Sequence, residues 1–564
     1  MKMDRHETRK DNGLPCIRHR ATLSEFRRAV DQEPTNAAAL HRVGIALVER
    51  GEAVAATEFL AKAAQIDRAK YGRDFADTLT RLQRWDDAAQ VYRSTLATLG
   101  GVSELWARLG GIYEQLGDWE EARNAHLQAI ELSPNWIHGY AGLYRTCIVH
   151  RSALEGEALA RKSIRSRGKS LISLLGLAKA LEQHGRYPEA HQYWEEALTE
   201  SPDNVTALLG AGTAKLATRN LDGARQNFDR AFERYPFDVW VRLEQFFFRL
   251  RIGLLAEARQ VLCTEETRKV LRGVGLRSHP DAAPHWDGTQ DLEGKTVFVE
   301  NRGGFGDTIQ FSRFAWMLKQ QGARVIVQCQ PALQRLLRSL PGADEVVAPY
   351  DECAPFDYQC RPDYAGFLMN WDWSSLKPDP PYITPNITPR QTVPTLGANS
   401  SRNCLKVGVA WLSAAQDHEN CYTFRSVPLE ALRPLTSVPD TRFFGLQVRA
   451  QGRGSGNWLA ANLGEHFKDF SDAAAATLTV DVVVAADSAM AHLAGALGKL
   501  CFVLLPYFAD WRWINDSAAN RSACPWYPTV RLFRQTRPGD WGEVVKALSS
   551  ALKDLLSPPA EPRA

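Results

Sequence analysis

A glycine-rich segment that ends in one aspartate is the first candidate for chemistry in this sequence. Gly303, Gly304 and Gly306 lie just before Asp307 and follow a β-branched and aromatic run at 296–299. Glycine has no Cβ atom, so a ligand can touch the backbone, and the helix expected next would direct its positive dipole end to the same place. Two interpretations of Asp307 are open: it caps that helix, or its carboxylate accepts a proton in a reaction.

A second polar segment surrounds one histidine. Asp487 and Ser488 precede a helical apolar pattern, and His492 lies four residues after Ser488, on the same helix face. The free N–H groups at such a helix start favour a diphosphate, and the planar guanidinium of Arg425 suits phosphate oxygens. The alternatives are a buried structural histidine and a surface ion pair for Arg425.

Strand and helix patterns alternate twice from residue 295 onward. The expected strands are 296–299, 324–328, 344–348, 406–411, 442–446, 481–486 and 500–505. The expected helices begin directly after the glycine loop, with an apolar face from Phe311 to Leu318, at Pro331, near Leu429 and at Ser488. Residues 350–385 show no regular pattern. We expect two lobes with parallel sheets and a ligand cleft between the carboxyl ends of their strands.

The composition excludes several classes of protein. The 564 residues include 68 basic and 65 acidic side chains, so the chain is no overall polycation for nucleic acid. No segment has the apolar length of a membrane span or of a secretory signal, which favours a cytoplasmic protein. The ten cysteines show no zinc-ligand spacing, so we expect reduced thiols and no metal.

The first half of the chain contains a repeat. Small residues, an aromatic residue and a proline recur at offsets 0, 3, 12, 19 and 24, first at Gly110, Tyr113, Ala122, Ala129 and Pro134. Similar positions return at Ala178, Ala190, Ala197 and Pro202, and then at Gly212, Ala224, Phe228, Ala231 and Pro236. This is the skeleton of the 34-residue tetratricopeptide repeat, and weaker copies, one of them around Tyr144, bring the expected number to about six or seven units.

Stacked units of this kind form an α solenoid with a concave groove. The groove is suited to hold a peptide, a protein or a neighbouring domain, and the alternative is a rigid spacer or an oligomerisation arm. Trp106, Trp119 and Trp194 are expected in the repeat core. The expected divisions are a disordered basic N-terminus at 1–21, repeats at 22–275, a connector at 276–294, a first lobe at 295–385, a linker at 386–403, a second lobe at 404–556 and a disordered tail at 557–564.

Residues 284–550 resemble the glycosyltransferase family 9 group, the heptosyltransferase-like enzymes of GT-B fold, and in particular a bacterial branch fused to tetratricopeptide repeats. The segments that carry the resemblance are Pro284–Gly288, Gly304–Phe311, Phe356–Gln359, Val407–Trp411, Arg425–Leu429, Asp487–Gly498, Pro506–Trp513, Pro525–Pro528 and Arg537–Trp541. The resemblance implies two Rossmann-like lobes and an inverting transfer of a sugar from a nucleotide-diphosphate donor to an acceptor hydroxyl, without a metal or another cofactor.

The resemblance also implies roles for single residues. Asp307 matches the proposed general base, and the segment Asp487, Ser488 and His492 matches the donor-binding motif. Arg425 stands where heptosyltransferases usually have a phosphate-binding lysine, and Gln447 stands where they more often have a ribose-binding glutamate. Trp511, Trp513, Trp526 and Trp541 resemble the repeat-fused branch and are expected in the core and hinge of the lobes.

Three functions are compatible with these features. The first is a cytoplasmic glycosyltransferase whose repeats present an acceptor, plausibly a protein, to the cleft. The second is an enzyme that glycosylates lipopolysaccharide or another cell-surface glycan, with the repeats serving assembly. The third is a repeat scaffold whose transferase half is inactive. The retention of Asp307, Arg425 and His492 together favours an enzyme.

Overall fold

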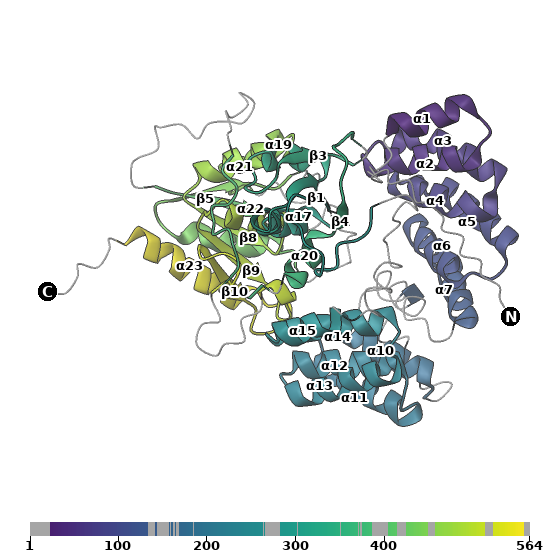
Figure 1. The fold of residues 1–564 in the computed structure, drawn as a ribbon. Coiled ribbons are helices and arrows are strands. Elements are labelled where there is room, and N and C mark those ends of the chain that lie inside the picture. The colour runs from purple at the N-terminus through teal and green to yellow at the C-terminus, as the bar shows by residue number, and fades with distance from the viewer. Residues whose placement is uncertain are drawn as a thin grey trace, which may run out of the picture.

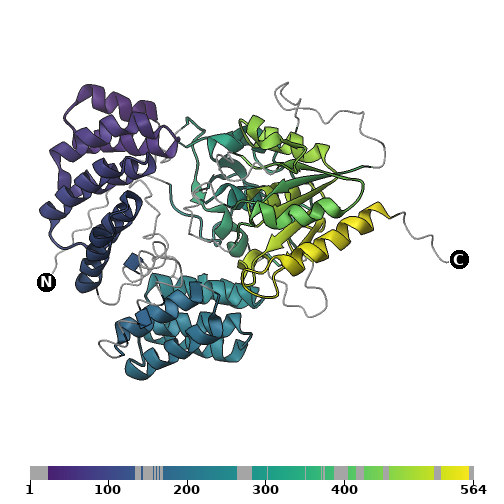
Figure 2. The same ribbon diagram turned by 180° about the vertical axis from the view of Figure 1, so that it is seen from behind.

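The computed structural model describes residues 23–133, 142–143, 157, 160–161, 164, 169–183, 185–262, 264, 283–301, 303–349, 351–369, 371–372, 375–385, 404–413, 425–448, 457–513 and 523–557. Two groups of helices stand beside an α/β region (Figure 1). The view from behind shows the same separation of the helices α1–α7 from α10–α15 (Figure 2). The predicted linker 386–403, the N-terminus 1–21 and the repeat copy around Tyr144 lie outside the described residues.

The helices of the first half form antiparallel pairs. They are α1 (Leu23–Gln32), α2 (Ala37–Glu49), α3 (Ala53–Ile66), α4 (Arg68–Arg81), α5 (Trp85–Leu99), α6 (Ser103–Leu116), α7 (Trp119–Leu132), α10 (Leu171–Gln183), α11 (Tyr187–Glu200), α12 (Val205–Ala217), α13 (Leu221–Arg234), α14 (Val239–Arg251) and α15 (Leu255–Leu262). A Cβ atom at Gly44 would lie 2.4 Å from the Leu60 side chain, and one at Gly110 would lie 2.5 Å from His126. The small residues of the repeat therefore let paired helices touch, as the spacing predicted.

The first α/β sheet has the strand order β3-β2-β1-β4, and all its pairs are parallel. Its elements are β1 (Thr296–Glu300), α17 (Phe305–Phe311), α18 (Phe314–Gln320), β2 (Arg324–Gln328), α19 (Pro331–Leu337), β3 (Glu345–Val347), β4 (Tyr358–Cys360) and α20 (Pro362–Leu368). The prediction of an irregular stretch at 350–385 is wrong in part, because β4 pairs with the central strand β1 and α20 follows it. A three-residue strand carries too little periodicity to be seen in the sequence.

The second sheet has the strand order β10-β9-β8-β5-β6-β7, again parallel throughout. Its elements are β5 (Leu405–Ala410), the 3-10 helix η1 (Leu429–Ser437), β6 (Thr441–Gly445), β7 (Ala461–Asn462), the 3-10 helix η2 (Leu463–His466), α21 (Phe470–Thr479), β8 (Val482–Ala486), α22 (Ala489–Ala496), β9 (Cys501–Leu505), the 3-10 helix η3 (Trp511–Trp513), β10 (Val530–Arg534) and α23 (Gly542–Leu556). Numbered along this half alone, the strands run 3-2-1-4-5-6, the order of dinucleotide-binding sheets.

In both sheets the order in which strands are added reverses beside the first strand, between β1 and β4 in one sheet and between β5 and β8 in the other. Open α/β sheets bind ligands outside the carboxyl ends of the strands at such a switch point. Asp307 lies on the helix that follows β1, and Asp487 directly follows β8. The strand order thus places both predicted polar segments at the two switch points.

The two lobes touch each other directly. The Arg335 guanidinium on α19 bonds the Asp469 carboxylate at the start of α21, with an N–O distance of 2.7 Å. The rings of Phe305 and Phe470 lie 4.8 Å apart across the same boundary. These contacts and the packing of α17 on α22 bring the carboxyl ends of the two sheets together.

The last repeats share a hydrophobic core with the lobes. Phe246 and Val261, on α14 and α15, belong to the same buried cluster as Phe311 of the first lobe and Trp513 of the second. The far end of the repeats makes a polar contact instead, between Arg50 and Asp351 at 2.5 Å. Among the described residues, no helix is long and apolar enough to cross a membrane.

Candidate functional site

Asp307 is fixed by two contacts at the start of α17. Gly304 is the N-cap residue, and its backbone N–H donates to Asp307 Oδ2 at 3.1 Å. Asp307 is therefore not the N-cap itself but lies one turn inside, where an acidic side chain reaches back to the cap. Its other oxygen, Oδ1, accepts from an Arg512 nitrogen at 2.6 Å. The side chain stays 39 % exposed, so a ligand can still reach the carboxylate.

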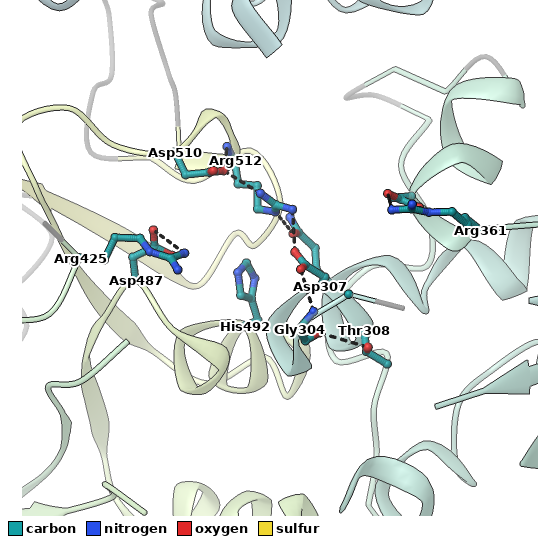
Figure 3. A network of polar contacts seen from close by, with 12 residues as sticks. Gly304, Asp307, Thr308, Arg361, Arg425, Asp487, His492, Asp510 and Arg512 are labelled. Carbon is teal, nitrogen blue, oxygen red and sulfur yellow. Dashed lines mark hydrogen bonds and ion pairs between the residues drawn. The ribbon is translucent and has the colours of Figure 1, made fainter. Parts of the chain in front are cut away.

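Arg512 crosses from the second lobe to the first. Its guanidinium donates to Asp510 Oδ1 at 2.8 Å and to Gln310 Oε1 at 3.0 Å, besides Asp307. The rings of Phe311 and Trp511 flank it, with 5.3 Å and 5.0 Å to their centroids. Figure 3 shows the continuous chain of contacts from Asp510 through Arg512 to Asp307. Arg512 was not among the predicted site residues, although it lies within the resemblance segment 506–513.

The N-terminus of α22 faces Asp307 and Arg512. Ser488 is its N-cap residue, and the backbone carbonyl of Asp487 accepts from the Ser413 hydroxyl at 2.6 Å. Within the described part of the chain, the buried Asp487 Oδ2 and Ser488 Oγ have no hydrogen-bond partner. Burial raises the pKa of the Asp487 carboxyl above its usual value. Unpartnered polar atoms at a helix start are what a bound polar ligand would satisfy.

Arg425 lies over the Asp487 carboxylate. The closest N–O distance is 3.8 Å, and the arginine side chain is 45 % exposed. The distance is thus too long for a hydrogen bond, and among the described residues most guanidinium N–H groups remain available. Figure 3 shows Arg425 and Asp487 on one side of His492 and Asp307 on the other. The structure brings Arg425, Asp487 and His492, all predicted at the donor site, into one region.

His492 is a buried, neutral residue in this structure. Its Nδ1 lies 3.1 Å from the Tyr527 hydroxyl, and its ring stacks on Trp513 with 4.9 Å between centroids. Burial, aided by the charge of Arg512, lowers the pKa of the imidazole to about 3. At neutral pH His492 can therefore offer an anion one hydrogen bond but no positive charge.

The burial of His492 predicts how stability depends on pH. The folded pKa lies below the unfolded value of 6.5, so the unfolded chain gains a proton first and stability is lost as the pH falls from 6.5 toward 3. Between pH 7 and pH 5 we expect the wild type to lose about 2 kcal/mol of unfolding free energy relative to His492→Asn. Urea denaturation of both proteins at the two pH values measures this difference. Equal losses in the two proteins would contradict a buried neutral imidazole.

At two positions of the loop, Gly303 and Gly306, the surroundings leave no room for a Cβ atom. A Cβ atom at Gly306 would lie 2.9 Å from His492 Cδ2, so the glycine permits α17 to approach α22. A Cβ atom at Gly303 would lie 2.8 Å from the Cβ atom of Asp307. The glycines thus serve the packing around the aspartate, while Gly304 supplies the backbone N–H that holds it.

Gln447 follows β6 at the same edge of the second sheet. Its side-chain oxygen accepts from the backbone N–H of Leu412, just after β5, at 2.9 Å. The contact fixes the side chain beside the switch point of the sheet, and its role toward a ribose stays a prediction. Among the described residues no group of three or more His, Cys, Asp or Glu side chains could hold a metal ion.

Comparisons with known proteins identify the repeats. A tetratricopeptide repeat family matches residues 73–135 and 175–239, so the first half contains tetratricopeptide repeats as predicted. Protein FlbA of Caulobacter vibrioides is 23 % identical over 80 % of this chain and 84 % of its own. Protein O-mannosyl-transferase TMTC3 of Mus musculus is 25 % identical over 31 % of this chain and 21 % of its own.

Other similarities cover smaller parts of the chain. The DnaJ protein P58IPK homolog B of Oryza sativa subsp. japonica is 25 % identical over 30 % of this chain and 42 % of its own. A solved tetratricopeptide repeat protein from Parabacteroides merdae has 15 % identity and a TM-score of 0.25, covering 45 % of this chain and 95 % of that one. The chain spans less than half the length of TMTC3 and of the DnaJ homolog.

Proposed function

We propose that the chain is a metal-independent, inverting glycosyltransferase of GT-B fold. It moves a sugar from a nucleotide-diphosphate donor to the hydroxyl of an acceptor that the repeats present. The main supporting observation is that Asp307, from the switch point of one parallel sheet, lies beside Arg425, Asp487 and His492, from that of the other (Figure 3). Ser488 is the N-cap residue of the helix that carries His492. One side thus offers a carboxylate and the other offers a cation and a helix N-terminus.

The donor is placed on the second lobe. The N–H groups at the start of α22 and the Arg425 guanidinium face the diphosphate, and the neutral His492 contributes one hydrogen bond. The unpartnered Ser488 hydroxyl bonds the same ligand. Gln447, which lies beside β5, faces the ribose. These contacts neutralise the departing diphosphate, a task that a metal performs in other transferases.

The transfer is a single displacement. The acceptor oxygen forms a bond to the anomeric carbon while the bond between that carbon and the diphosphate oxygen breaks, and the electron pair leaves with the nucleoside diphosphate. The acceptor proton moves to the Asp307 carboxylate, whose contacts with Gly304 and Arg512 leave lone pairs on both oxygens. Attack from the face opposite the leaving group inverts the anomeric carbon.

A protein acceptor is supported by the architecture and by one relative. The repeats share a core with both lobes, so whatever they bind is held next to the transferase half. One similar protein is named a protein O-mannosyl-transferase, although the chain covers only 21 % of it. On the first lobe, Arg361 follows β4 on the side of Asp307 (Figure 3), and its guanidinium pairs with Asp363 at 2.7 Å.

Release of nucleoside diphosphate tests the reaction. The full chain is incubated with UDP-, GDP-, ADP- and dTDP-sugars in the presence of EDTA, with and without a bacterial protein extract as acceptor source. We expect one donor to be consumed, faster with extract, and EDTA to leave the rate unchanged because no metal takes part. Failure to consume any donor, or loss of the reaction in EDTA, would contradict the proposal.

Arg425→Ala is expected to weaken binding of the nucleoside diphosphate by about 1–3 kcal/mol, because a charge-assisted contact to phosphate is lost. The corresponding monophosphate, which lacks the outer phosphate, should lose less. Calorimetric titration of both nucleotides measures the difference. Arg433→Ala, an exposed arginine of the same lobe that pairs with Glu430, is the matched control and should bind like the wild type.

A further inference from the structure

The segment 507–512 joins the last repeats to the candidate base. At its start, the Phe508 ring lies 5.7 Å from the Tyr187 ring of α11, and the Arg251 guanidinium of α14 lies 5.2 Å from its centroid. The Tyr507 hydroxyl donates to the backbone carbonyl of Ala217 on α12 at 3.3 Å. Three repeat helices therefore hold the beginning of this segment.

The end of the segment holds Asp307. Asp510 Oδ1 accepts both from the Arg512 backbone N–H at 3.0 Å and from its guanidinium at 2.8 Å, so the arginine is tied to its own loop. The same guanidinium then reaches Gln310 and Asp307 on α17. Because the aromatic rings of Phe311 and Trp511 also flank it, the arginine has little freedom to take another position.

We propose that Arg512 is a positioning residue for Asp307 and that the repeats set its place through the segment 507–512. In this arrangement the tetratricopeptide repeats do more than hold an acceptor, because they help to orient the carboxylate that removes the acceptor proton. The inference rests on the proposed function for the role of Asp307, but the contact chain itself is independent of any substrate.

The contacts distinguish positioning from phosphate binding. The Nε atom and both terminal nitrogens of Arg512 already donate to Gln310, Asp510 and Asp307. Arg425, in contrast, is half-exposed and 3.8 Å from its neighbour. Three of the five N–H groups of Arg512 are thus used by the protein, whereas among the described residues the closest carboxylate oxygen to the Arg425 guanidinium lies 3.8 Å away.

Hydrogen exchange of the full-length protein, without a substrate, tests the contacts that link the repeats through Arg512 to Asp307. The Gly304 N–H donates to Asp307, so a carboxylate that loses its orientation should expose this amide. We expect exchange in the peptide 303–311 to rise about tenfold in Arg512→Gln and about threefold in Phe508→Ala, with β9 unchanged. Arg512→Lys should restore part of the protection. The control is Arg531→Gln, because Arg531 is an exposed arginine that stacks on Phe502 and Phe533.

Kinetics then separate this inference from the proposed function. With the donor that the wild type consumes, Arg512→Gln should lower kcat about a hundredfold and leave the nucleotide affinity within twofold, since a misplaced base costs rate and not binding. The double variant Asp307→Asn, Arg512→Gln should be no slower than Asp307→Asn alone. Unchanged exchange at 303–311 in Arg512→Gln, or losses that multiply, would overturn the inference. A wild type that binds no nucleotide would refute only the proposed function.

Discussion

Asp307→Asn is expected to reduce sugar transfer by about 10²–10⁴-fold, the usual contribution of a positioned general base. The amide keeps the size of the side chain and can still accept the Gly304 N–H, so the loop should stay in place. Nucleotide affinity should remain within about twofold, because the groups that we propose to bind the phosphates lie on the other lobe. Initial rates and calorimetric titration of the same preparation measure the two effects.

Asp379→Asn provides the matched control for this change. It removes the same charge from an exposed carboxylate near the end of the first lobe, where the partner is Lys377. An exposed ion pair contributes little to stability, so this variant should behave like the wild type. If Asp307→Asn kept full turnover, another group would have to take the acceptor proton and the assignment would fail.

Phe246→Ala is expected to cost about 3–5 kcal/mol of unfolding free energy, as for other buried phenylalanines. Phe246 lies on α14 and packs edge-on against Phe367 of α20, with 5.1 Å between centroids. Because its cluster includes both lobes, hydrogen exchange should rise in β1 and β9 as well as in α14. Exchange that changed only within the repeats would show that the core is not shared.

Phe228→Ala serves as its comparison within the repeats. Phe228 is also buried but packs on Phe248 in a cluster of repeat residues alone. Its loss should raise exchange in α13 and α14 and leave β1 protected. The core that Phe246 shares with the lobes also affects shortened proteins. A fragment that begins near residue 280 lacks α14 and α15, so the apolar residues of the lobes that pack on these helices become exposed.

Local sequence patterns were sufficient to predict the strands that precede the candidate site residues. The runs at 296–299 and 481–486 appear as β1 and β8, each followed by the expected glycine or serine turn and a helix. These segments combine β-branched periodicity with clear helix-start residues, so local propensity and tertiary structure agree. The burial of Trp511, Trp513, Trp526 and Trp541 also follows the expectation.

Contacts between distant residues explain what the sequence did not reveal. Arg512 and Asp307 are 205 residues apart, and no spacing rule connects them. The single helix expected after the glycine loop is divided at Ser312 and Arg313 into α17 and α18. Arg313 is buried there and donates to the Trp526 carbonyl of the other lobe at 3.1 Å, so tertiary contacts accompany the break.

The protonation state of His492 could not be predicted from the sequence either. Its place one turn inside a helix start suggested an imidazole that faces phosphate, and the structure does place it between Arg425 and Asp307 (Figure 3). Its pKa depends on burial under Trp513 and Tyr527, which come from later segments. Position can thus be read from a motif, whereas protonation depends on the packed surroundings.

Calorimetric titration of the full chain with UDP, GDP, ADP and dTDP, and with their sugar conjugates, tests whether the second lobe binds a nucleotide-diphosphate donor. We expect one nucleoside diphosphate and its sugar conjugate to bind at a single site without a divalent metal, and Arg425→Ala to weaken the binding of both. The base that binds then identifies the donor class. A folded wild type that binds none of these nucleotides would contradict the proposed function and favour a repeat scaffold without transferase activity.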